Sequence, residues 1–233
     1  MRMCATQALG INNVNHNTQA VSTADCRDYP CEQSQALVLL NGDKVPLADL
    51  PFALSAYALV VCVDGAWNQL VADGDDEKVH QIIGDGDSIL DPAPSKWQIA
   101  HDQSTTDFEK TLLYLDKLGF NQADIYWGSG GEMDHFLGNL AVAARYHDRI
   151  RCVFYDQHQA YFFTQTAVRL HGQIHQTITL YPFPAATVSS DGLRYELHQT
   201  DLAIKTQQSL RNEIIETKAH LTVSGDLWVF ITR

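Results

Sequence analysis

The sequence predicts an α/β protein: a parallel, Rossmann-like sheet with helices on both faces, followed by a smaller all-β sandwich domain. Short apolar runs, mostly continuous, are typical of strands that are buried on both faces. Helical stretches alternate with these runs, as in a parallel sheet with right-handed crossovers. After about residue 157 the helical periodicity fades and β-type segments follow. We therefore expect an α/β nucleotide-binding domain at residues 35–157 and an all-β domain at 158–233.

Strands and helices of the first domain follow from its apolar pattern. The clearest helix is Asp107–Leu118, with Thr106 as its N-cap, Glu109 placed for a capping box and Gly119 as its stop. A second helix runs from about Asp134 to about residue 146. The first helix would bury an apolar stripe at i, i+4 and i+7: Phe108, Leu112 and Leu115. The predicted strands are Ala36–Leu40, Ala58–Val63, Val79–Ile83, Ile125–Trp127 and Cys152–Tyr155.

The second domain is predicted from β-type runs that are separated by turn residues. The runs are Tyr161–Phe163, Ala167–Leu170, Ile174–Tyr181, Leu193–Leu197, His220–Val223 and Leu227–Thr232. The expected turns are His171-Gly172, Pro182–Pro184, Asp191-Gly192 and Ser224-Gly225-Asp226.

Composition excludes several classes of protein. A formal net charge of −12 over 233 residues argues against a general nucleic-acid-binding surface, which needs a basic face. Five cysteines form no CxxC pair and are odd in number, which favours a reducing compartment over a disulfide framework. No run is long and apolar enough to span a membrane. Residues 1–34 lack the apolar core of a secretory signal, so we expect a disordered extension and a cytoplasmic protein.

Four acidic patches recur where an apolar run gives way to a turn or a helix start. They are Asp64–Asn68, Gly84–Ser88, Asp102–Phe108 and Gly130–His135. In an open α/β sheet, ligands collect beyond the carboxyl ends of the strands. Carboxylates that meet there repel one another unless a cation lies between them, and Mg²⁺ carrying a polyphosphate is such a cation. Nearby glycines would let the backbone approach phosphate: Gly65, Gly84, Gly86, Gly128, Gly130 and Gly131.

Each of these residues also has an ordinary structural interpretation when it is taken alone. Asp64 and Asp87 could be turn or cap residues, Asp107 could stabilise a helix start, and Lys110 could be a solvated surface lysine. The prediction of a magnesium–nucleotide site therefore depends on four such patches falling on one edge of the sheet.

The motifs resemble those of the thiamine pyrophosphokinase family, in order and in spacing. Asp64–Leu70 resembles DGGANxL, although Ala66-Trp67 replaces the usual Gly-Ala. Gly84–Ser88 resembles GDxDS, the stretch from Asp102 to Lys110 resembles DQxxTDFxK, and Gly130–His135 resembles GGxxDH. In the β domain, Ser209 and Asn212 match an SxxN element, and Gly225–Trp228 resembles the terminal strand of the family. The resemblance covers about residue 36 to the end.

The resemblance implies that the hydroxyl of thiamine attacks the β-phosphorus of ATP, with Mg²⁺ bound and AMP leaving. It implies metal ligands among Asp64, Asp85, Asp87 and Asp107, of which the last three are also the candidate catalytic residues. It implies nucleotide contacts by Asp64, Asn68, Gln103, Lys110, Gly130, Gly131, Asp134 and His135. It implies a thiamine side formed by Ser209, Asn212 and Trp228. It further implies a homodimer whose active site lies between the subunits, with no nucleic-acid or membrane partner.

Three other functions are compatible with parts of the sequence. Asp85-Gly-Asp87-Ser also resembles the signature of an aspartate-dependent phosphatase, but that function leaves the other patches unexplained. A pyrophosphokinase acting on a pterin alcohol could share the α/β half, and the C-terminal domain counts against it. A non-catalytic nucleotide or thiamine sensor could retain the pockets, although the presence of every acidic position argues against a decayed site.

Overall fold

The computed structural model describes residues 11–13, 35–50, 53–86, 89, 97–99, 104–171 and 174–233. The chain divides into two compact units, one of Cys31–Gln157 and one that contains His158–Arg233. The fold is mixed, with many strands and few helices, and all α-helices of the described residues lie in the first unit. Within the same residues, no helix has the length and apolar character that crossing a bilayer requires.

The first unit is built on six parallel strands in the order β7-β6-β2-β3-β4-β5. Their bounds are β2 Gln35–Leu39, β3 Leu59–Val63, β4 Gln81–Gly84, β5 Trp97–Ile99, β6 Gln122–Tyr126 and β7 Arg151–Tyr155. Every residue of β2 is buried, as its continuous apolar run predicts for a strand in the middle of a sheet. β5 was not expected from the sequence, because its three residues are too few to form a recognisable run.

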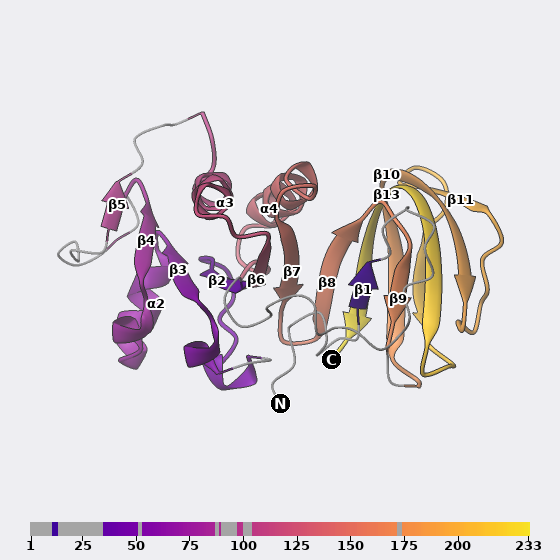
Figure 1. Ribbon diagram of the computed structural model, residues 1–233, viewed down its shortest axis with the longest axis horizontal. Helices are drawn as coiled ribbons and strands as arrows, with labels where there is room; N and C mark the ends of the chain where they lie inside the picture. The colour runs from indigo at the N-terminus through magenta and orange to yellow at the C-terminus, as the bar shows by residue number, and fades with distance from the viewer. Residues whose placement is uncertain are drawn as a thin grey trace. The chain divides into compact units, whose positions relative to one another are not determined.

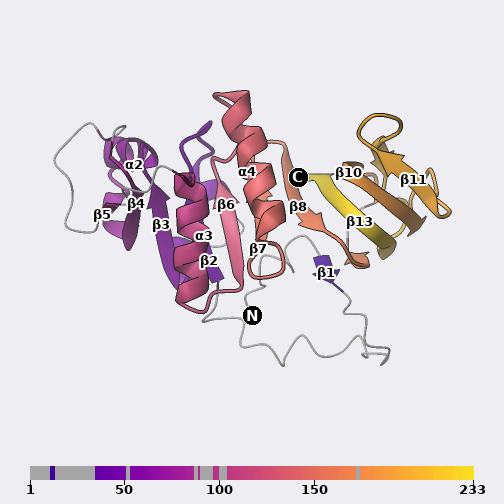
Figure 2. The ribbon, with the colours of Figure 1, turned by 90° about the horizontal axis from the view of Figure 1, so that it is seen from above.

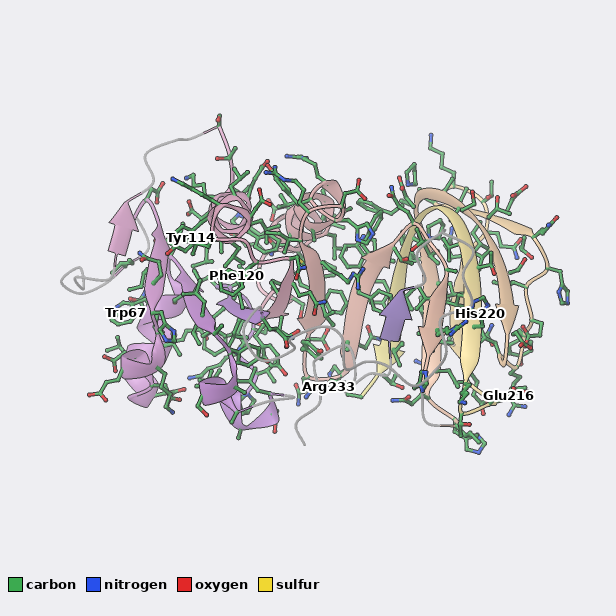
Figure 3. All side chains as sticks on the ribbon, viewed as in Figure 1. Trp67, Tyr114, Phe120, Glu216, His220 and Arg233 are labelled. Atoms are coloured by element: carbon green, nitrogen blue, oxygen red, sulfur yellow. The ribbon has the colours of Figure 1, made fainter. Side chains whose placement is uncertain are left out.

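Helices lie on both sides of this sheet. They are α2 Ala66–Asp73, α3 Asp107–Lys117 and α4 Met133–Arg145, with short 3₁₀ turns η1 Leu47–Asp49, η2 Leu54–Ala56 and η3 Asp76–Lys78. In Figures 1 and 2, α3 and α4 cover one face of the strands and α2 lies on the other. The side chains drawn in Figure 3 fill the layers between helices and sheet, where the labelled Trp67 of α2 is buried.

The predicted helix start at Thr106 is confirmed, but the capping box is only half formed. The Thr106 hydroxyl accepts a hydrogen bond from the backbone N–H of Glu109 at 3.2 Å. The Glu109 carboxylate accepts from Arg145 at 2.8 Å and from Tyr146 at 2.9 Å, both at the end of α4. The glutamate therefore links two neighbouring helices, a role that a local motif cannot reveal. The predicted buried stripe of α3 is also confirmed, with Phe108, Leu112 and Leu115 at most 3% exposed.

β6 fastens the chain that connects β2 to β3. Asp124 accepts a hydrogen bond from the Tyr57 hydroxyl at 2.8 Å. The Tyr126 hydroxyl donates to the carbonyl of Asp49 at 3.2 Å, and the indole of Trp127 donates to the carbonyl of Val45 at 2.8 Å. Two hydrogen bonds from β6 and one from the residue after it thus hold this long connection at its start, middle and end.

The second unit is antiparallel. β8 Gln159–Thr164, β9 Val168–Leu170 and β10 Thr177–Asp191 each pair with the long β13 Ala219–Thr232. β11 Thr200–Ala203 and β12 Ser209–Glu213 pair with β10. β1 Ile11–Asn13 pairs with β9. β1 falls within the segment that we expected to be a disordered extension, and the rest of that segment lies outside the described residues.

Two predicted turns are irregularities inside long strands rather than chain reversals. Pro182–Pro184 lies within β10, and Ser224–Asp226 lies within β13. The pairing of these two strands shifts between Pro182 and Ala186, opposite Gly225. Gly225 has φ of 102°, and a Cβ there would lie 2.7 Å from a backbone oxygen. Proline and glycine thus mark the level at which both strands depart together from regular pairing.

The predicted strand Leu193–Leu197 is a loop in the structure. Of these residues, Leu193 alone forms a β-bridge, with Ile214. The backbone of Tyr195 bonds to a side chain, the amide of Asn212, at both its N–H and its carbonyl. Since these side-chain bonds replace a sheet ladder, apolar alternation alone was not sufficient to predict the local structure.

We predict that Asp124 makes the protein less stable as the pH rises from about 4 to 7. The carboxyl is 1% exposed, and burial raises its pKa to about 7, although hydrogen bonds from Tyr57 and Gln35 lower it. Between the two pKa values the folded state binds more protons than the unfolded state, so stability falls with pH across that window. Asp124→Asn imitates the protonated carboxyl and should flatten this dependence.

The measurement is urea unfolding of both proteins at several pH values between 4.5 and 7.5. The difference between them isolates Asp124 from the other titrating groups. Parallel stability curves would show that burial does not perturb this carboxyl.

Candidate active site

Three carboxylates meet at the carboxyl edge of the parallel sheet. Asp64 follows β3, Asp85 follows β4, and Asp107 is the first residue of α3. Each offers one oxygen, and these oxygens all lie within 4.8 Å of one another. Asp64 is buried, whereas Asp85 and Asp107 are half-buried. The structure thus brings together one residue from each of the first three acidic patches.

Asp64 is held by the backbone around it. Its N–H donates to Ile83 of β4 and its carbonyl accepts from Trp67, both at 3.0 Å. Its φ of 40° is in the left-handed region, which aspartate adopts more readily than most residues. A Cβ at Gly84 would lie 2.8 Å from the Cβ of Asp64, so glycine is needed at the end of β4 to admit this side chain.

One lysine offsets part of the negative charge. The Lys110 ammonium lies 2.8 Å from an oxygen of Asp107, one turn along α3, with the two side chains 12% and 21% exposed. Behind the site, burial and the nearby carboxylate of Asp64 raise the pKa of the Cys62 thiol, which therefore stays neutral. Cys62 and Cys152 are free and buried.

The donor set fits a magnesium ion. Mg²⁺ prefers oxygen ligands, is bound through one or a few carboxylates, and keeps several waters for phosphate to replace. Three carboxylate oxygens this close together would repel one another strongly without a cation. Two further predicted site residues, Asp87 and Gln103, lie outside the described residues.

We expected these glycines to leave room for phosphate, but at most of them the space of the missing side chain is filled by other atoms of the protein. A Cβ at Gly65 would lie 2.4 Å from the amide nitrogen of Asn41. At Gly128 it would lie 2.9 Å from the ring of Phe154. At Gly130, where φ is 78°, it would lie 2.0 Å from the carboxyl carbon of Asp43. Gly131 differs, because its missing side chain faces open space.

The loop after β2 was missed in the sequence. Gly42 and Asp43 donate backbone hydrogen bonds to the carbonyls of Trp127 and Ser129, both at 2.8 Å. These bonds continue the parallel pairing of β2 and β6 beyond the ends of both strands. Asn41-Gly-Asp43 directly follows a buried apolar run, just as the four acidic patches do. Applying the same criterion to this run would have identified the loop.

The fourth acidic patch lies at the start of α4. Asp134 accepts a hydrogen bond from the N–H of His135 at 3.0 Å, and the His135 ring lies 3.3 Å from Glu132. All three side chains are exposed and form a group separate from the three buried or half-buried carboxylates. Asn139, one turn further on, donates to the carbonyl of Gly128 at 3.3 Å and so holds the glycine loop against α4. Asn68, in the first turn of α2, is half-buried.

In the second unit, the amide of Asn212 is fully used within the protein. Its oxygen accepts from the N–H of Tyr195 at 3.0 Å and of Glu213 at 2.8 Å. Its nitrogen donates to the carbonyl of Tyr195 at 2.8 Å and to the hydroxyl of Ser209 at 3.5 Å. An amide offers two donors and two acceptor positions, so this one has no free capacity. Asn212 is 1% exposed, whereas Ser209 is half-buried.

Trp228 is a core residue of the second unit. It is fully buried in the middle of β13. Its ring centroid lies 5.8 to 6.3 Å from those of Tyr161, Phe163 and Phe230.

We predict that alanine is tolerated worse at Gly130 than at Gly131. Both have positive φ, 78° and 60°, so alanine at either position costs about 1 to 2 kcal/mol of backbone strain. At Gly130 the new methyl group must also displace the carboxylate of Asp43, whereas at Gly131 it meets nothing. Urea unfolding of the two variants should show the larger loss for Gly130→Ala. Equal losses would mean that Asp43 is not packed over Gly130.

Comparison with known proteins gives a consistent result. Residues 52–154 match the family described as "Thiamin pyrophosphokinase, catalytic domain". "Thiamine pyrophosphokinase 1" of Oryza sativa subsp. japonica is 27% identical, over 85% of this chain and 87% of that protein. "Thiamine pyrophosphokinase 2" of Arabidopsis thaliana is 24% identical, over 82% and 85%.

Solved structures show the same fold. The thiamine pyrophosphokinase of Bacillus subtilis superposes with a TM-score of 0.71 at 19% identity, covering 85% of this chain and 98% of that one. The thiamin pyrophosphokinase of Candida albicans gives 0.71 at 18% identity, over 86% and 89%. The resemblance to the thiamine pyrophosphokinase family that we inferred from four motifs is confirmed by these similarities.

Proposed function

We propose that the protein is a magnesium-dependent thiamine diphosphokinase. It transfers the diphosphoryl group of ATP to the hydroxyl of thiamine, giving thiamine diphosphate and AMP. The observation that carries this proposal is the convergence of Asp64, Asp85 and Asp107, which each place one oxygen within 4.8 Å of the others. All three lie inside the matched catalytic domain. Diphosphoryl transfer needs little covalent chemistry from the protein and much positioning and charge neutralisation.

The metal side of the site consists of Asp64, Asp85 and Asp107, with Asp87 proposed as a fourth ligand. Mg²⁺ bound there would neutralise phosphate charge and polarise the reacting phosphorus. Asp107 is our candidate to orient the thiamine hydroxyl and take its proton. The hydrogen bond from Lys110 orients the Asp107 carboxylate before a substrate binds. The proton leaves the hydroxyl oxygen as that oxygen bonds to phosphorus, and AMP departs with the electron pair of the broken bond.

The nucleotide side includes the remaining residues that the family motifs assign. We propose that Asn68, Gln103, Lys110, Gly130, Gly131, Asp134 and His135 contact ATP, together with Asp64. Gly131 supports this assignment most directly, because its backbone faces open space at the carboxyl edge. Asn139 would keep the glycine loop in place for such a contact.

We assign the thiamine side to Ser209, Asn212 and Trp228 of the second unit. The half-buried Ser209 suits a direct contact. Asn212 would act by shaping the strand, since its amide bonds are internal. Trp228 would act through the aromatic core of the second unit, where it is fully buried. We further propose a Rossmann-like nucleotide-binding domain at 35–157, a β-sandwich at 158–233, and a homodimer that completes the active site between subunits. Sedimentation of the intact 26.0 kDa chain measures the last point.

We expect AMP and thiamine diphosphate to form in equal amounts when the protein is incubated with Mg-ATP and thiamine. Activity should disappear with excess chelator and return with added Mg²⁺, because the three carboxylates cannot hold a triphosphate by themselves. Products are separated by chromatography. Formation of ADP or free phosphate in place of AMP would favour the phosphatase alternative, and nucleotide binding without turnover would favour a sensor.

Asp107→Asn should lower turnover by about 10²-fold or more, the scale of losing a general base, while the fold survives. Asparagine keeps the size of the side chain and its place at the helix start. If Asp107 only stabilises the helix, the loss is about 0.3–1 kcal/mol of stability, with turnover unchanged.

Asp116→Asn is the matched control on the same helix. It removes the same charge from a side chain that pairs with Arg149 at the surface. Melting temperature and AMP release are measured for both variants. An Asp107 variant that melts a few degrees lower but turns over normally would remove this residue from the site.

A further inference from the structure

We propose that the loop Asn41–Asp43 recognises the nucleoside end of the substrate, with the Asp43 carboxylate accepting hydrogen bonds from the hydroxyls of the ribose. The inference extends the proposed function, since it assumes that a nucleotide binds at this edge. None of the family motifs in the sequence includes the loop.

The order of the strands places this loop at the reversal point of the sheet. β2 lies between β6 and β3. The chain runs from β2 to β3 on one side, and from β6 through α4 to β7 on the other. Ligands of open α/β sheets bind in the crevice between two such diverging connections. The loops after β2 and β6 are therefore the two sides of that crevice.

The loop is fixed rather than free to move aside. Two backbone hydrogen bonds join Gly42 and Asp43 to the loop after β6. A Cβ at Gly42 would lie 2.3 Å from the carbonyl oxygen of Ser129, so any other residue would force the loops apart. From α2, the Gln69 amide donates to Asn41 at 3.3 Å and to the carbonyl of Gly42 at 3.4 Å.

These contacts hold Asp43 in a fixed position at the protein surface. Its carboxylate lies directly over Gly130, in the loop that carries the open Gly131, and the residue is exposed. It is not a member of the group formed by Asp64, Asp85 and Asp107, so it lies outside the proposed magnesium site. Asn41 lies directly over Gly65, on the side of the loop toward α2.

Charge decides what Asp43 can bind. An ionised carboxylate accepts hydrogen bonds and repels phosphate oxygens. The donors of ATP are the ribose hydroxyls and the adenine amino group. The ribose is the nearer of the two to the phosphates, which we propose the glycine loop contacts. Acidic residues take the ribose hydroxyl in the dinucleotide-binding sheets of the same architecture.

The test compares ATP with 2′-deoxy-ATP and 3′-deoxy-ATP, in equilibrium titrations with Mg²⁺ and in the AMP-release assay. The wild-type protein should bind ATP about 10-fold to 100-fold more tightly than either deoxynucleotide, the scale of a hydrogen bond to a charged group. In Asp43→Asn and Asp43→Ala, the ratio of the affinity for ATP to the affinity for each deoxynucleotide should fall toward one, mainly because ATP binds more weakly. Turnover at saturating ATP should be kept.

Asp148→Asn is the control, because Asp148 is an exposed aspartate in the turn after α4. It should leave the ratio unchanged. Equal loss of affinity for all three nucleotides in the Asp43 variants would show that Asp43 only supports the loop, and would overturn the inference. So would a wild-type protein that does not discriminate among them. Titration without thiamine keeps this test separate from the proposed reaction, whose failure would appear only as absent AMP.

Discussion

Mutual repulsion among three carboxylates is the constraint on which the rest of the α/β unit depends. Asp64, Asp85 and Asp107 place oxygens within 4.8 Å of one another, an arrangement that flexible chains would relax. Each carboxylate is therefore carried by a separate rigid support: the end of β3, the end of β4 and the start of α3. The repulsion would contribute to the binding free energy of the proposed divalent cation, and the ammonium of Lys110 offsets part of it. A site of this kind needs a stiff sheet more than it needs any particular loop sequence.

Glycine has a different role here from the one that phosphate-binding loops suggest. At Gly65, Gly84 and Gly130, the missing side chain makes room for Asn41, Asp64 and Asp43 respectively. The polar groups at the edge are brought closer together than loops with ordinary residues would permit. The glycines thus set the spacing between side chains, whereas Gly131 presents an open face.

Sequence patterns correctly predicted features that depend on neighbouring residues in the chain. They failed for features that depend on contacts between residues far apart in the sequence. The buried runs, the α3 stripe and the Thr106 cap follow from spacing alone, and the structure contains them. The parallel pairing could only be inferred by rule, but it brings the three aspartates to one edge as expected. Glu109 was misjudged because its partners are on another helix, and Leu193–Leu197 because the Asn212 amide replaces a strand partner. Proline and glycine in β10 and β13 were wrongly taken as turns between strands, because the pairing of two long strands makes them a shared irregularity within those strands.

The three hydrogen bonds from β6 and Trp127 to the connection after β2 also bear on the order in which this region forms during synthesis. They join residues 67, 77 and 82 positions apart, so a large loop must close before any of them exists. A nascent chain that ends at residue 121 already contains all three metal-site carboxylates but not the strand that shapes the loop beside them. The acidic residues are thus made early, whereas the connection beside them is held in place only when β6 enters the middle of the sheet.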